Sequence, residues 1–219
     1  MPTTREALLN AALTALSELP WSGIRMVDVA VAAGVSRQTL YNEFGSKDGL
    51  ARALIRREAD GYLHGVDRLL GRDRAANCAE RLAVIAEWTV GEARSRPLLR
   101  ALLTGCWGEH LPAPRAARPV SRAIVPAQRR ADAGHPAPGE LVASVRDRIL
   151  AVFEHDGRGR GREEPVQLAR RCELAIRLAL SCVVAPPPGG VAGVGPLVRH
   201  MAGSGAGGVS GSNPRAGGR

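Results

Sequence analysis

Polar side chains that can hydrogen-bond to the edges of DNA bases lie close together in one short stretch of the sequence. Arg37, Gln38 and Thr39 are adjacent, and Asn42 comes about one helical turn later. Arginine can pair with guanine through two hydrogen bonds, and glutamine or asparagine can pair with adenine in the same way. In the N-terminal half of a helix, these residues have the chemistry needed to recognise base pairs in the major groove.

Such a helix must be held by a second helix, and the residues before it have the required types and spacing. Two helices can cross closely when the contact residue is small, the turn allows a positive φ, and the second helix supplies an apolar anchor. Ala30, Gly34 and Leu40 stand at these positions. The sequence therefore predicts a helix that starts at Met26 and ends by Gly34, followed by a recognition helix capped by Ser36.

A longer run of residues around these two helices resembles the N-terminal signature of the TetR family of bacterial repressors. The resemblance covers roughly residues 5–55. It rests on residue types that fall in register without a gap: Ala33-Gly34-Val35-Ser36, Thr39-Leu40-Tyr41, Phe44, Ser46-Lys47 and Leu50. The resemblance implies a three-helix DNA-binding head, a helical body that binds a small molecule and forms a dimer, and repression that ends when this molecule binds.

The resemblance also implies roles for single residues of the head. Tyr41 would contact phosphate through its hydroxyl, and Phe44 would pack inside the head. Lys47 would meet phosphate at the start of the next helix, where the helix dipole favours an anion. The full set of candidate DNA-binding residues is Arg25, Ser36, Arg37, Gln38, Thr39, Tyr41, Asn42 and Lys47.

Two positions depart from the usual pattern of the family. The family often has threonine at the start of the first of the two helices, where this chain has Arg25 and Met26. A hydroxyl contact to phosphate is lost there, and Arg25 is a candidate to replace it. Glu43 stands where the family often has histidine, and its carboxylate would repel phosphate unless it turns toward Arg37 or Lys47. These positions bear on the operator sequence and not on the motif.

Hydrophobic periodicity predicts helices along most of the chain, and no segment is identified as a strand. We expect an all-α fold with three parts. These are a helix-turn-helix DNA-binding head (1–47), a helical-bundle body for ligand binding and dimerisation (48–202), and a disordered glycine-rich tail (203–219). The expected helices are 3–19, 26–33, 37–43, 47–70, 74–95, 97–107, 140–155, 166–185 and 194–202.

Two segments inside the body are expected to be loops. Residues 110–138 contain six prolines around one short helix expected near 120–131, and 157–161 alternates glycine with arginine. Proline and glycine in these numbers favour irregular backbone. The sequence therefore predicts a long loop or gate and a flexible link.

Aromatic and apolar residues of the body could line a pocket for a small apolar or amphipathic effector. Trp88, Leu103 and Trp107 are the candidates, although packing in the core explains the tryptophans equally well. The expected homodimer needs an apolar surface, and 166–185 carries a helical stripe whose partner is either 140–155 or 194–202. The stripe consists of Leu168, Cys172, Ala175, Ile176, Ala179 and Val183.

The formal net charge of +9 favours an anionic partner such as double-stranded DNA, but its distribution weakens that inference. Residues 1–60 contain seven basic and seven acidic residues, so the basic excess lies outside the proposed head. A second hypothesis therefore stays open, in which the chain is a helical small-molecule carrier or interaction protein that does not bind DNA. Salt-dependent binding to its own promoter would distinguish the two.

Several other functions lack their usual sequence patterns. The chain has no nucleophile elbow, phosphate-binding glycine loop or zinc-protease motif, so we expect no enzyme and no cofactor. The four cysteines and five histidines show no metal-ligand spacing, so no metal site is expected. The longest apolar run, Leu178 to Ala185, is too short to span a bilayer, and we expect a cytoplasmic protein without membrane contact.

Overall fold

The computed structural model describes residues 3–72, 77–113, 136–155 and 165–203, and in these ranges the chain is helical, without strands. The all-α expectation is confirmed. The helices are α1 (Thr4–Glu18), α2 (Met26–Ala32), α3 (Arg37–Phe44), α4 (Lys47–Arg72), α5 (Cys78–Ser95), α6 (Pro97–Thr104), α8 (Pro138–His155), α9 (Pro165–Val184) and α10 (Val194–Gly203), with short 3-10 turns η1 (Trp21–Gly23) and η3 (Gly190–Gly193). The short helix expected near 120–131, the link at 157–161 and residues 204–219 of the expected tail lie outside the described residues.

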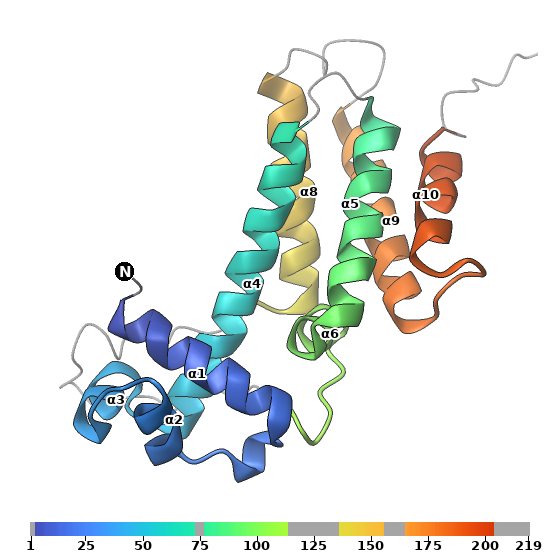
Figure 1. Ribbon diagram of the computed structural model, residues 1–219. Coiled ribbons are helices and arrows are strands. Elements are labelled where there is room, and N and C mark those ends of the chain that lie inside the picture. Colours follow the sequence, from blue (N-terminus) through green and yellow to red (C-terminus); the bar gives the residue numbers. More distant parts are fainter. Residues whose placement is uncertain (1–2, 73–76, 114–135, 156–164, 204–219) are drawn as a thin grey trace, which may run out of the picture.

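The head and the body share α4, which leaves the head and continues into the bundle (Figure 1). Helices α1, α2 and α3 surround its first turns at one end of the molecule. The body consists of α4 and α8 beside α5 and α9, with α10 packed on α5 and α9 and the short α6 next to the head. One continuous apolar core runs through both parts, from Leu8 in α1 to Ala202 in α10.

Side chains at the helix ends explain several boundaries. Thr3 and Glu6 form the expected capping box, in which Thr3 Oγ1 accepts from the Glu6 amide at 3.2 Å and Glu6 Oε2 accepts from the Thr3 amide at 2.7 Å. Asn77 caps α5 by accepting from the Glu80 amide, so this helix begins after the residue 74 that was expected. Gly105, at φ 73°, ends α6 at Thr104 and not at 107.

The apolar stripe on α9 that was expected to form the dimer interface faces the inside of a single chain. Cys172, Ala175 and Ala179 are at most 1% exposed and pack against the core that α5 and α8 share with α9. The prediction was wrong because periodicity reports an apolar face but does not say which helix covers it. The exposed apolar residues of α9 are others, among them Leu174 and Val184.

An ion pair with two hydrogen bonds joins α10 to α5, and its contribution to stability depends on pH. Arg199 donates to the Glu80 carboxylate through Nε at 2.7 Å and Nη2 at 2.9 Å. These hydrogen bonds lower the pKa of Glu80 below its ordinary value of 4.5. The pair therefore stabilises the fold above pH 4.5 and loses this effect as the pH falls through the lowered pKa.

We expect acidification to loosen α10 selectively. Amide hydrogen exchange in Val194–Gly203 should accelerate, relative to α4, as the pH falls below about 4.5, after correction for the intrinsic rate. The effect should be small, because both side chains are about two-fifths exposed. In the Glu80→Gln variant, α10 should exchange faster at neutral pH and show no such step. A step of equal size in the variant would show that another group titrates.

The described helices include none that is both long enough and apolar enough to span a membrane. Their most apolar members, such as α6, are short and pack inside the molecule.

Candidate nucleic-acid interface

The crossing of α2 and α3 has the geometry that the residue spacing predicts. Ala30 and Leu40 are at most 1% exposed, and Gly34 adopts φ 68° in the turn between them. The amide of Val35 donates to the carbonyl of Ala30 at 3.0 Å, which closes the turn. Because only glycine takes this backbone conformation at little cost, the turn depends on Gly34.

Ser36 fixes the start of the recognition helix. Its Oγ accepts from the Thr39 amide at 3.0 Å and lies 2.8 Å from the Thr39 hydroxyl. The predicted cap is confirmed, and it gives Ser36 and Thr39 structural roles in the free protein. Because the Thr39 hydroxyl is held at the cap, it is less available to a base than the side chains of its neighbours are.

The remaining base-reading candidates lie on the surface of α3. Gln38 Nε2 donates to Asn42 Oδ1 at 2.9 Å, one turn along the helix. Gln38 then retains one N–H and its carbonyl oxygen, which is the donor and acceptor pair that adenine requires. The guanidinium of Arg37 lies over the ring of Tyr41, 5.3 Å from its centre. The structure thus places two side chains that can recognise bases, Arg37 and Gln38, next to each other, and a neighbouring side chain holds each of them.

Lys47 begins α4 and is held near the surface by the 3-10 turn η1. Its Nζ donates to the carbonyl of Ser22 at 3.2 Å and lies 5.3 Å from the centre of the Trp21 ring. Partial burial lowers the pKa of this ammonium group, and Asp48 opposes the shift. The positive charge therefore occupies a defined position at the N-terminus of α4, where an anion is favoured.

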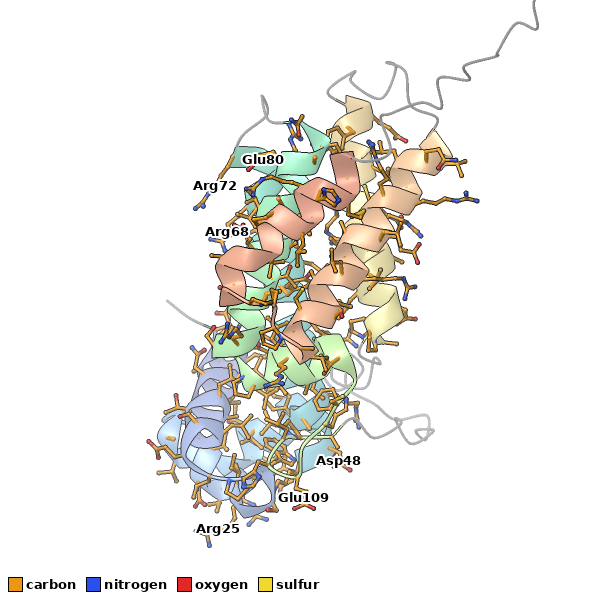
Figure 2. All side chains as sticks on the ribbon, turned by 90° about the vertical axis from the view of Figure 1, so that its right-hand side faces the viewer. Arg25, Asp48, Arg68, Arg72, Glu80 and Glu109 are labelled. Atoms are coloured by element: carbon orange, nitrogen blue, oxygen red, sulfur yellow. The ribbon has the colours of Figure 1, made fainter. Side chains whose placement is uncertain are left out.

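Arg25 lies at the far end of the head, well away from Glu80 and Arg72 at the other end of the molecule (Figure 2). Its guanidinium forms two hydrogen bonds with Asp28, at 2.8 and 3.1 Å, and these raise its pKa. A phosphate would have to compete with Asp28 for this side chain. The role of Arg25 as a phosphate contact stays a prediction.

Glu43 pairs with a residue that the sequence did not suggest. Its carboxylate lies 3.4 Å from Nη1 of Arg5, so of the two alternatives considered for Glu43, a turn toward Arg37 or Lys47 is not the one that the structure has. The guanidinium of Arg5 also covers the buried ring of Phe44, 4.7 Å from its centre. Arg5 is thus a head residue that sequence reasoning missed, because its partners lie almost forty positions away and no local pattern marks them.

The three candidate ligand residues are placed differently from one another. Trp88 stacks on Tyr62 with ring centres 5.6 Å apart, Leu103 is buried in α6, and Trp107 follows the end of that helix. Tyr62 shares a hydrogen bond with Thr89, and burial raises the pKa of Tyr62 to about 12, so its hydroxyl stays neutral.

The walls of a small cavity between α5 and α9 and of two grooves beside α1 do not include Trp88, Leu103 or Trp107. The cavity, lined by residues such as Leu82 and Ala175, measures only about 10 Å³ and is no larger than a water molecule requires. The ligand roles of the three residues therefore stay predictions. Among the described residues, no group of histidine, cysteine or acidic side chains could hold a metal ion.

Comparison with known proteins agrees with the geometry of the head. Residues 8–54 match the family model described as bacterial regulatory proteins of the tetR family. The chain is 40% identical over 101 residues to the HTH-type transcriptional regulator AlkX of Mycobacterium tuberculosis. This alignment covers 46% of this chain and 47% of that protein. The N-terminal part of the chain is thus similar to regulators of the TetR family. The chain spans about half the length of the curated relatives that it matches.

Solved structures of two bacterial regulators extend the likeness of the fold to the body. The repressor AlkX from Dietzia sp. strain DQ12-45-1b has a TM-score of 0.54 at 20% identity, covering 92% of this chain and 95% of that one. The regulator FadR from Bacillus subtilis, in complex with stearoyl-CoA, has a TM-score of 0.53 at 13% identity, covering 91% and 97%. At these identities the likeness concerns the fold, and it agrees with a TetR-type head joined to a helical body.

Proposed function

We propose that this chain is a ligand-responsive DNA-binding transcriptional regulator, a repressor that a small apolar or amphipathic effector releases from its operator. The proposal rests on two side chains on the surface of α3 that can recognise DNA bases, Arg37 and Gln38. Arg37 is held over the ring of Tyr41, and Gln38 is hydrogen-bonded to Asn42. Residues 1–47 would form the DNA-binding head, 48–202 the ligand-binding and dimerisation body, and 203–219 a tail. Binding to chromosomal DNA implies the cytoplasm as its location.

The direct contacts follow from the chemistry of each side chain. Arg37 and Gln38 would read bases, while Tyr41, Lys47 and Arg25 would contact phosphates. Asn42 would orient the amide of Gln38, and Ser36 with Thr39 would hold the start of the helix. The relatives named above are transcriptional regulators, which agrees with the expectation that the chain is not an enzyme.

The effector class is supported by the relatives. The Dietzia AlkX is implicated in the biodegradation of n-alkanes, and the Bacillus FadR was solved with stearoyl-CoA. An n-alkane and a stearoyl group are both apolar hydrocarbon chains. We therefore favour an effector with an apolar chain, bound in the body and without a cofactor.

A dimer is required because one head makes too few contacts for a specific site. Two heads must reach successive major grooves on one side of the duplex, about one helical turn apart or a little more. Because the inner stripe of α9 is already covered, the interface would use the outward face of α9, where Leu174 and Val184 are exposed. Replacing Leu174 by Asp should shift the protein toward the monomer in sedimentation experiments.

Substitutions in the head separate base reading from phosphate binding. Arg37→Ala should cost about 1–3 kcal/mol of operator binding and relax the preference at one base pair. Lys47→Ala should weaken binding to all sequences. It should also reduce the slope of the logarithm of the binding constant against the logarithm of salt concentration by about 1 in magnitude. Arg72→Ala, at the opposite end of α4, is the matched control and should leave both unchanged (Figure 2). Binding should be measured by fluorescence anisotropy on the promoter of the chain's own gene and on mutated sites.

The same measurement tests the alternative of a helical carrier or interaction protein that does not bind DNA. Such a protein would show no salt-dependent binding to its promoter. An equal loss across every operator sequence for Arg37→Ala and Lys47→Ala would refute the division of roles. Binding that is absent at low salt would refute the proposed function itself.

A further inference from the structure

A groove of about 430 Å³ lies where the head meets the body. Its walls come from α1, from α4, from the corner between α5 and α6, and from the segment after α6. The lining residues are Leu13, Leu16, Ser17, Glu58, Ser95, Arg96, Pro97, Leu98 and Leu111. Binding sites for small molecules commonly have volumes of about 300–1,000 Å³ and lie between domains, so this groove is of suitable size and position.

The segment after α6 closes the groove by returning to the head. The chain descends from α6 toward the end of α1 (Figure 1), and Glu109 lies at the same end of the molecule as Arg25 and Asp48 (Figure 2). The amide of Trp21 donates to the carbonyl of His110 at 2.9 Å. Leu111, the next residue, then forms one wall of the groove. This hydrogen bond thus joins the head and the body beside the groove.

The groove combines apolar walls with a single charged cluster. Leu13 and Leu16 line it from α1, and Leu98 and Leu111 line it from the body. Such walls favour a ligand with a compact apolar part, because transfer of hydrocarbon surface from water into an apolar groove lowers the free energy.

The charged cluster contains one guanidinium group and two carboxylates, of which Glu58 lines the groove. Arg96 donates to Glu58 at 2.7 Å and to Glu92 at 3.0 Å, so one guanidinium serves two carboxylates. The side chain of Glu58 is only 7% exposed, and Arg96 reaches its Oε2 atom. An ionised carboxylate accepts through both oxygens, so Oε1 is left to another donor. Arg57, the residue before Glu58 in α4, donates to Asn10 through Nη2 and lines the wider groove beside α1 together with Glu58.

We propose that this junction groove binds a small organic cation with an apolar body, such as a protonated alkylamine. The ammonium group donates to Oε1 of Glu58, while Arg96 keeps its bond to Oε2 and its second bond to Glu92. The alkyl chain packs against the leucines of α1 and of the body. Burying a charge is tolerated when it is paired and hydrogen-bonded in this way.

A ligand in this groove would touch α1 and the body at the same time. It therefore favours the head orientation seen in this structure over any orientation that opens the groove. This regulatory consequence rests on the proposed function, whereas the binding site itself does not. The site is separate from the one expected near Trp88, Leu103 and Trp107, none of which lines the groove.

Isothermal titration calorimetry of the full chain with three six-carbon probes tests the site. Hexylammonium should bind saturably, with 1-hexanol and hexanoate at least about tenfold weaker. Glu58→Gln removes the charge but keeps the shape, and it should weaken hexylammonium binding about tenfold. Glu154→Gln, on the exposed end of α8, is the charge control and should bind as the parent chain does.

A second pair of variants keeps Glu58 in place, in case its replacement unfolds the protein. Ser17→Lys brings a tethered ammonium group into the groove and should abolish hexylammonium binding, whereas Ser17→Gln should leave most of it. Equal affinities for hexylammonium and 1-hexanol would overturn the proposal, as would tighter binding of hexanoate or unchanged binding to Ser17→Lys. Hexylammonium binding without any DNA binding would refute the proposed regulator function and leave the site standing.

Discussion

Replacing Gly49 by alanine is expected to unfold the head, although alanine is the better helix former. A Cβ atom at this position would overlap the carbonyl oxygen of Phe44 and lie 3.0 Å from its carbonyl carbon. Both are backbone atoms and cannot rotate away. The same oxygen accepts from the Ser46 amide at 2.7 Å, which fixes the connection between α3 and α4. We expect a loss of about 3 kcal/mol or more in the free energy of unfolding.

Urea denaturation followed by circular dichroism measures this loss, and operator binding should fall with it. Gly91→Ala is the matched control, because a Cβ atom on Gly91 inside α5 would meet nothing within 4 Å. It should stabilise the protein by about 0.5–1 kcal/mol through helix propensity alone. If Gly49→Ala stabilises the protein as much as Gly91→Ala does, the close contact with Phe44 is not present in solution.

The head could be predicted from the sequence because its determinants are local. The capping box of Thr3 and Glu6, the cap at Ser36 and the positive φ of Gly34 each depend on residues a few positions apart. Such signals survive in the sequence whatever the rest of the chain does. The register of the recognition helix, and with it the placement of Arg37 and Gln38 on its surface, followed from them.

The contacts between distant segments could not be predicted in the same way. The pair of Arg5 with Glu43 and the closure of His110 on Trp21 join residues on elements that only the folded chain brings together. The stripe of α9 is apolar as predicted, but it was assigned to a partner subunit, whereas α5 and α8 cover it. Periodicity marks a face for burial, and only the arrangement of the other helices decides what buries it.

The ion pair of Glu58 with Arg96 is another contact between distant segments that the sequence did not predict, and its loss should affect stability. Glu58 and Arg96 line both the junction groove and a wider groove of about 950 Å³ between α1 and α4, so their ion pair lies where the two grooves adjoin. This pair joins the middle of α4 to the corner of α5 and α6. Nothing in the sequence near either residue distinguishes it from the many exposed ion pairs of helices.

We expect the two partners of this pair to respond unequally to substitution. Arg96→Met should destabilise the protein by about 3 kcal/mol, because the nearly buried carboxylate of Glu58 would lose its donor. Glu58→Gln should cost less, since the amide oxygen can still accept from Arg96 and Glu92 still pairs with the guanidinium. Urea denaturation at about pH 7 measures both changes.

The double variant shows whether Arg96→Met destabilises the protein by removing the ion pair or by leaving the charge of Glu58 unpaired. In Glu58→Gln with Arg96→Met, no charge is left to be buried at position 58, so the loss should be smaller than in Arg96→Met alone. A double variant that loses the sum of the two single losses would show that the residues act independently. The pair would then be a surface contact of little weight, and Glu58 would lack the buried, partly satisfied carboxylate on which the recognition of a cation depends.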